Sequence, residues 1–308
     1  MARSAWHGFI VAALSGFLIA GTAIADDSPL PERRLSLMAN TDMPGGDLAQ
    51  LFDTTLQACI QACAGNAECR SLTYNERARA CFPKAEAGAP TPFDGAISGY
   101  AVSPSPEAVA RARGRAGAAP FLTADDLSSA LTQARTFAAM QRPLPASGSD
   151  RAEIRSLEYG GNLSAATQLL AAYVARDDLA QDWVDLARMT LRAEDGSQQA
   201  ASAAQMALNG YLRAEEDVVA GQALYHLARS YDHLDRGRDG LAALRLARQI
   251  APGDPDITSA LEQSEARNGL RVTDSRVEAD GKMPRFCAVL TRELSPSTDY
   301  APFLRLPE

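Results

Sequence analysis

The hydrophobic and polar positions of this chain change period at about Val102 and again at about Leu270. From Leu30 to Val102, short alternating runs are separated by turn residues, which predicts short strands around one helix. From Asp150 to Leu270, apolar residues recur at every third or fourth position of an alanine-rich sequence, which predicts helices throughout. Alternation then returns, and Arg285–Thr291 is predicted to be a strand. The pattern indicates a multidomain α+β protein.

Changes in composition divide the chain further. The run from Ser103 to Pro120 holds little besides alanine, proline, glycine and arginine, and we expect a linker there. A helix is predicted from Thr123 onward, and Pro143 ends it. The expected segments are a signal peptide at 1–25, a small disulfide-stapled module at 30–102, a linker with one helix at 103–149, helical repeats at 150–270 and a β-strand tail at 271–308.

The N-terminus has the pattern of a secretory signal peptide. Arg3 precedes an apolar run from Phe9 to Ala20, and Ala23-x-Ala25 supplies the small residues that signal peptidase requires. An uncleaved transmembrane anchor is the alternative, but the apolar run is short for a membrane span. We therefore expect a periplasmic or secreted protein, with the membrane involved only through the signal peptide.

Four of the five cysteines lie between Cys59 and Cys81, with the spacing C-x3-C-x5-C-x11-C. This spacing is unlike that of structural zinc sites, and no histidine lies near it. Export would place these thiols in an oxidising compartment, which favours disulfides over metal. Cys59 and Cys63 lie one turn apart on a predicted helix, so both face the same side of it. Four cysteines still allow three pairings.

The same window resembles the PAN/Apple family. The family motif C-x3-C-x5-C-x3-T-Y-N…C-x-x-K is matched at Cys59, Cys63, Cys69, Thr73-Tyr74-Asn75, Cys81 and Lys84. The resemblance implies a helix lying across a small antiparallel sheet, tethered to it by the pairs Cys63–Cys69 and Cys59–Cys81. It also implies a module used for binding.

The helical segment contains one unit that resembles a tetratricopeptide repeat. Small residues at its consensus positions would let paired helices approach, and large ones would fill the space between repeats. A weaker copy precedes it, and an ordinary helical bundle is the alternative. The predicted packing residues are Trp183, Leu186 and Ala187 in the weaker copy, and Leu224, Leu227, Ala228, Tyr231, Gly240, Leu244, Ala247 and Pro252 in the clear one.

The order of these segments resembles the N-terminal region of bacterial alpha-2-macroglobulin-like proteins, which trap proteases in the periplasm. The C-terminal sequence F-C-A-V-L, beginning at Phe286, resembles the start of a macroglobulin domain. No bait region fits within this chain, and it has no Cys-x-Glu-Gln thioester motif. The resemblance therefore implies the N-terminal part of such a protein, without the bait and thioester regions that trap a protease.

Little in the sequence points to catalysis. No H-E-x-x-H, G-x-S-x-G or phosphate-binding glycine loop occurs, so we expect no enzyme and no cofactor. His226 and His233 lie on one predicted helix and are interpreted as exposed helix residues, without a metal site. Cys287 is expected to be a buried or unpaired thiol. The net charge of −8, with a basic run only at Arg111–Arg115, argues against nucleic acid as a partner.

Two functions follow from these observations. The first is an exported, non-catalytic scaffold that binds an unknown protein or glycan through the PAN-like module and the helical repeats. The alternative is participation in protease inhibition, with proteases engaged through macroglobulin domains that this chain lacks.

Overall fold

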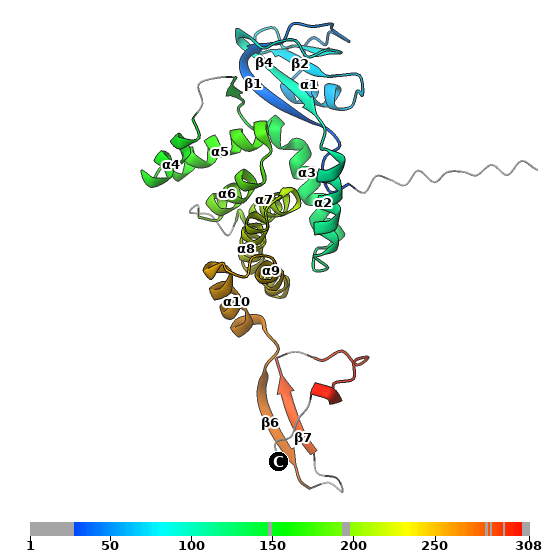
Figure 1. Ribbon diagram of the computed structural model, residues 1–308, viewed down its shortest axis with the longest axis vertical. Coiled ribbons are helices and arrows are strands. Elements are labelled where there is room, and N and C mark those ends of the chain that lie inside the picture. The colour runs from blue at the N-terminus through cyan, green and yellow to red at the C-terminus, as the bar shows by residue number, and fades with distance from the viewer. Residues whose placement is uncertain are drawn as a thin grey trace, which may run out of the picture.

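The computed structural model describes residues 28–146, 150–192, 198–280, 283, 285–291 and 293–303. The predicted signal peptide at 1–25 lies outside these described residues. Figure 1 shows a small sheet at one end, a body of stacked helices, and a two-stranded hairpin at the other end. The architecture is α+β, as the sequence predicts. Among the described helices, none has the length and apolar character that crossing a membrane requires.

The sheet has five strands in the order β3-β2-β4-β1-β5. All neighbours are antiparallel except β5, which pairs parallel to β1 at Met38 and Ala39. Helix α1 lies across one face of the sheet (Figure 1). The elements are β1 (Arg34–Asp42), α1 (Leu56–Ala64), β2 (Ser71–Asn75), β3 (Ala80–Lys84), β4 (Thr91–Val102) and β5 (Leu144–Pro145).

Alternation along the strands separates the two faces of this sheet. Leu72 and Tyr74 of β2 are buried in the apolar core that α1 covers. Thr73, between them, belongs to the opposite face, where its hydroxyl lies 2.7 Å from that of Ser98 and donates to the Asp42 carboxylate at 2.9 Å. The sheet is therefore apolar beneath the helix and hydrogen-bonded on its other side.

Residues 103–149 do not form a linker with one helix. They contain α2 (Pro106–Gly117) and α3 (Ala124–Met140), and α2 begins at a Ser105 cap with a proline in its first turn. Ala112 and Ala119 are fully buried in the core of the helical body. A sequence of alanine and arginine therefore packs closely here, because alanine lets the helix backbone approach α7 and the arginines remain at the edge.

The helical body continues with seven more helices. They are α4 (Ala152–Tyr159), α5 (Leu163–Asp177), α6 (Ala180–Arg192), α7 (Ala200–Arg213), α8 (Asp217–His233), α9 (Gly237–Ile250) and α10 (Pro255–Asn268). Successive helices pack against each other, and α8 also contacts both α6 and α10. The helices α6, α8 and α10 therefore form one layer, with α7 and α9 behind it.

The predicted packing residues of this body lie in its core, with one exception. Trp183, Leu186, Ala187, Leu224, Leu227, Ala228, Tyr231, Gly240, Leu244 and Ala247 are all buried. Pro252 is exposed, because it follows the end of α9 and stops the helix without packing against another one.

The C-terminal elements are β6 (Val272–Glu278), β7 (Arg285–Leu290) and a short 3-10 helix at Ala301–Phe303. The two strands pair antiparallel, and Val277 lies directly opposite Phe286. These two side chains are 71% and 64% exposed, so the hairpin presents apolar surface to solvent. Cys287 is half-buried on β7 and forms no disulfide with a described residue.

Candidate binding site

Three neighbouring hollows of about 560, 480 and 490 Å³ lie along one face of the helical body, and together they are called the groove below. The first lies between α4 and α6, the second between α6, α8 and the start of α10, and the third between α8 and α10. The first and second share Asp185, Arg188 and Arg192, while the second and third share Tyr225 and Arg229 among their lining residues.

Helix α6 shows how the sequence builds this groove. Leu186 and Ala187 on one side are buried in the body, whereas Asp185, Arg188 and Arg192 line the groove on the other. These three residues are three or four positions apart, so they share one helix face. Packing of the apolar face against α7 therefore turns a row of charged residues toward the groove.

The charges of the first hollow are held in ion pairs. The Glu158 carboxylate accepts hydrogen bonds from Arg188 at 2.6 and 3.1 Å, and also from Arg192. The bond from Arg188 is the main reason that the pKa of Glu158 is lowered. This carboxylate is only 18% exposed, so its own position is restricted by the residues around it. The bonds to it therefore restrict the orientation of both guanidinium groups.

Arg151 and Asp182 also line the first hollow. Arg151 donates to Asp182 Oδ1 at 2.5 Å and to Asp177 Oδ2 at 2.6 Å, and its guanidinium lies 4.5 Å from the centre of the Tyr173 ring. Asp182 is 5% exposed, and its Oδ2 has no hydrogen-bond partner among the described residues. Burial raises the pKa of this carboxyl group.

The second hollow is centred on His226, which is half-buried and not exposed as the sequence predicted. Its pKa is lowered to about 4 by burial and by the positive charges of Arg188 and Arg229. The Tyr225 ring lies edge-on at 4.9 Å, and Arg229 donates to the Tyr225 hydroxyl at 3.3 Å. His233 is exposed and lines the third hollow.

The sheet and the helical body are joined by a polar contact. Arg34 and Ser36 of β1 donate to the Arg176 carbonyl at the end of α5, at 3.0 and 2.8 Å. The Asp178 carboxylate lies 3.3 Å from Arg34 and accepts from Trp183 at 2.7 Å and from Arg213 at 2.8 Å. One carboxylate therefore links the sheet to α6 and α7.

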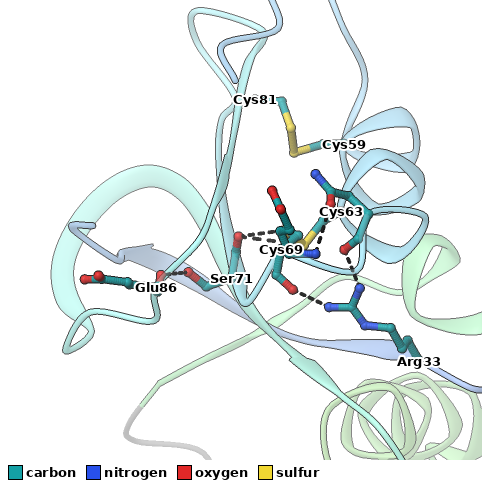
Figure 2. The surroundings of a disulfide bond; sticks show 9 residues. Arg33, Cys59, Cys63, Cys69, Ser71, Cys81 and Glu86 are labelled. Atoms are coloured by element: carbon teal, nitrogen blue, oxygen red, sulfur yellow. Dashed lines mark hydrogen bonds between the residues drawn. A yellow bond between two sulfur atoms is a disulfide. The ribbon is translucent and has the colours of Figure 1, made fainter. Parts of the chain in front are cut away.

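The two disulfides tether α1 to the sheet. They join Cys59 to Cys81 and Cys63 to Cys69, and all four cysteines are fully buried. This is the pairing that the PAN/Apple resemblance implies. Figure 2 shows the Arg33 guanidinium against the second bridge, where it donates to the carbonyls of Asn66 and Cys69. The bridges are therefore structural. Arg33, just before β1, is hydrogen-bonded to the backbone beside the second one.

The outer edge of β3 is covered by an irregular segment. Leu51 exchanges backbone hydrogen bonds with Cys81 at 2.9 and 2.8 Å, and the Leu48 amide donates to the Pro83 carbonyl at 2.8 Å. This protects the edge from pairing with another chain. Beside it, Phe52 is 66% exposed, and Phe93 on β4 is 51% exposed. These two aromatic side chains are available on the surface of the module.

Residues 35–102 match the family described as PAN domain. The matched residues include α1, both disulfides and all of β1 apart from its first residue. The chain thus carries a PAN domain with two disulfides, followed by a helical region. No curated protein and no solved structure matches the chain.

The sequence identified the cysteines of the PAN domain and the buried face of the helices, but it did not identify the groove. Arg188, Tyr225 and Arg229 occupy the polar positions between the predicted packing residues. A search for charged residues opposite those packing positions could have found them. Among the described residues, no three His, Cys, Asp or Glu side chains come together in a way that could hold a metal ion.

Proposed function

We propose that this chain is an exported, non-catalytic binding protein with two recognition surfaces, the PAN domain and the groove along α4, α6, α8 and α10. The observation that carries the proposal is the row of three hollows, in which each hollow shares lining residues with the next along a layer of packed helices. An extended surface of this kind suits a polypeptide segment better than a small molecule.

The charges of the groove support binding more than catalysis. Glu158 pairs with both Arg188 and Arg192, and the bonds between them hold the side chains in place. A surface of fixed, half-exposed charges gives specificity to an interface. Among these residues we find no acid and base placed to act together on a substrate, so we propose no reaction for the chain.

The PAN domain supports a binding role, since such domains typically bind proteins or carbohydrates. We propose that its ligand contacts the end of the sheet where Phe52 and Phe93 are exposed. The link through Arg34 and Asp178 would hold the two surfaces in a fixed relation, so that one ligand could touch both. Two buried disulfides favour an oxidising compartment, which agrees with the proposed export.

Photo-crosslinking in a periplasmic extract tests this proposal. The full chain would carry a photoreactive phenylalanine at Tyr159, which lines the groove and is 90% exposed, or at Phe93 in the PAN domain. Val218 is 57% exposed, lies outside the groove lining and serves as the control position. We expect discrete adducts from Tyr159 or Phe93 that excess unlabelled chain removes, and none from Val218. Adducts of equal pattern at all three positions would contradict the proposal.

The β6–β7 hairpin favours a second candidate function, a part in protease inhibition together with macroglobulin domains. An isolated two-stranded hairpin is marginally stable, and this one exposes Val277 and Phe286 on paired strands. We propose under this candidate that the hairpin is completed by further β-strands. The test is to read the genome downstream for an open frame that encodes macroglobulin domains, and its absence would count heavily against this candidate.

A further inference from the structure

The arginines that line the three hollows are paired with carboxylates to different extents. In the first hollow Arg188 and Arg192 share Glu158, and in the third Arg267 lies 2.9 Å from Asp232. Arg229, which lines both the second and the third hollow, has no carboxylate partner among the described residues, and its bond to the Tyr225 hydroxyl leaves its charge uncompensated. A carboxylate placed beside Arg229 would therefore meet a guanidinium that no other carboxylate holds.

His226 lines the same hollow. Burial is the main cause of its lowered pKa, and the positive charges of Arg188 on α6 and Arg229 on its own helix lower it further. The hollow is large enough, at about 480 Å³, to admit a side chain next to them. Gln181 and Gln222 also line it and offer amide donors.

Three acidic residues line this hollow as well, and two of them are engaged. Asp185 accepts from Gln181 at 3.1 Å and from Arg188 at 3.3 Å. Asp254 caps α10 by accepting from the amides of Asp256 and Ile257 at 2.9 and 3.2 Å. Asp256 is exposed at the rim shared with the third hollow, and it is the residue that opposes an anionic ligand.

We propose that the second hollow binds the side-chain carboxylate of an aspartate or glutamate on a polypeptide segment that runs along the groove. This inference rests on the proposed binding function and names the chemistry that the groove recognises. In the bound state Arg229 pairs with the carboxylate, His226 lies beside it, and the flanking hollows hold the residues before and after it. The charge-assisted bond from an arginine is of the kind that carries affinity and orientation together.

The shape of the groove favours a side-chain carboxylate over a C-terminal one. The second hollow shares lining residues with a hollow on each side, so a bound chain would extend from it in both directions. The whole chain carries a net charge of −8, so general attraction of acidic peptides is disfavoured. Binding of such a peptide would therefore report the local site.

Fluorescence polarisation with the full chain tests the proposal. The probes are three amidated, fluorescein-labelled peptides of twelve residues, in which alanine alternates with glutamate, with glutamine or with lysine. A fourth probe is the glutamine peptide with a free C-terminal carboxylate. We expect the glutamate peptide to bind about tenfold more tightly than the glutamine peptide, the effect of one or two charge-assisted hydrogen bonds.

Variants locate the binding in the second hollow. We expect Arg229→Gln and His226→Gln each to weaken binding of the glutamate peptide by about five- to tenfold. Asp256→Asn should strengthen it, because the opposing charge is removed. Arg238 is an exposed arginine of α9 outside the groove lining, so Arg238→Gln is the matched control and should change nothing. Circular dichroism checks that each variant is folded; Arg229 is exposed, so its substitution leaves the core intact.

The pH dependence supplies a second readout. A bound carboxylate would raise the low pKa of His226, so binding would take up a proton and tighten as the pH falls from 7 toward 5. Arg188, Arg192 and Arg229 remain charged over this range. Asp185, Asp254 and Asp256 also face the hollow, so the variant His226→Gln is needed to assign the effect. We expect that variant to lose the tightening.

Several results would overturn the inference. They are equal binding of the glutamate and glutamine peptides, preference for the lysine peptide, unchanged affinity in both Arg229→Gln and His226→Gln, or tightest binding of the free C-terminal carboxylate. If adducts at Tyr159 form equally well in the Arg229→Gln chain, the groove binds proteins without this site. The inference would then fail while the proposed function stands.

Discussion

The PAN domain and the helical body hold their residues together in different ways. The core of the PAN domain contains four half-cystines among leucines, isoleucines and one tyrosine, and two covalent bonds fix α1 to the sheet. The helical body has no disulfide among its described residues and buries alanines between helices, with Trp183, Tyr211 and Tyr231 filling the wider spaces. A small domain therefore relies on cross-links where a larger one relies on contact area.

In both regions, the residues that stabilise the fold are different from those that a partner can contact. The cysteines are the clearest motif in the sequence of the PAN domain, and they are fully buried. In the helical body the noticeable residues are again the buried ones, and the groove is made by charged residues on the opposite face. In both regions, the residues available to a partner are those that the sequence patterns leave unassigned.

The largest effect is expected from Trp183→Ala. Trp183 is 1% exposed, packs against Phe137 at 4.8 Å between ring centres and donates to Asp178. Its removal should cost about 3–5 kcal/mol of unfolding free energy, as for other buried aromatic residues. Hydrogen exchange read by mass spectrometry should show faster exchange in α5–α7. Trp183→Phe keeps most of the packing and should cost much less. Equal loss of protection in the PAN domain would show that the two regions do not unfold separately.

The double substitution Cys59→Ala/Cys81→Ala should act on the other region. A disulfide across this separation of 22 residues contributes about 2–4 kcal/mol. We expect faster exchange in α1 and β3, with α7–α9 unchanged, measured by the same method. Cys287→Ala is the matched control because that thiol is free. Loss of the helical body on removal of the bridge would contradict the separation.

Acid should weaken the helical body through His226. The folded-state pKa is about 4, below the ordinary value near 6.5, so the unfolded chain binds the additional proton between these values. Stability should therefore fall as the pH drops from about 6.5 to 4, by about 2 kcal/mol. His226→Gln should remove this part of the pH dependence in chemical denaturation. An unchanged profile in that variant would show that His226 is not the group responsible.

Asp126 acts in a different pH range. Burial raises its pKa, but bonds from Arg236 and Thr123 outweigh burial and lower it to about 2. Its contribution is therefore present above pH 4 and lost only below it. The two groups can be separated by the range in which each titrates.

The smallest effect is expected at the junction between the two regions. Asp178 has a positive φ of 56°, a conformation that asparagine also tolerates. Asp178→Asn keeps the backbone but removes the charge that Arg34 and Arg213 share, at a cost of about 1 kcal/mol. Thermal unfolding measures this cost. We expect the exchange of β1 near Ser36 to rise as well, and a purely local effect in α7 would show that the sheet is held by other contacts.

The sequence predicted local features well and contacts between distant segments poorly. The PAN motif identified both disulfides, and periodicity identified Trp183 and Leu224 as buried. Helix α2 was missed because its sequence contains no large apolar residue apart from Val109, although alanine is what lets this helix approach α7. The low pKa of His226 comes mainly from burial, and Arg188 on α6 contributes to it from a neighbouring helix, which no local pattern specifies.

Because of strand β5, the sheet of the PAN domain extends beyond residue 102, where the sequence match ends. Leu144 returns after α2 and α3 to pair with Met38, so the last strand of the sheet comes from beyond residue 102. A fragment ending at residue 102 would leave the amides and carbonyls of β1 unpaired along that edge, free to bond to a second copy. Residues 35–102 alone therefore do not contain the whole sheet of the domain. Its sheet is completed by residues that belong, in sequence, to its neighbour.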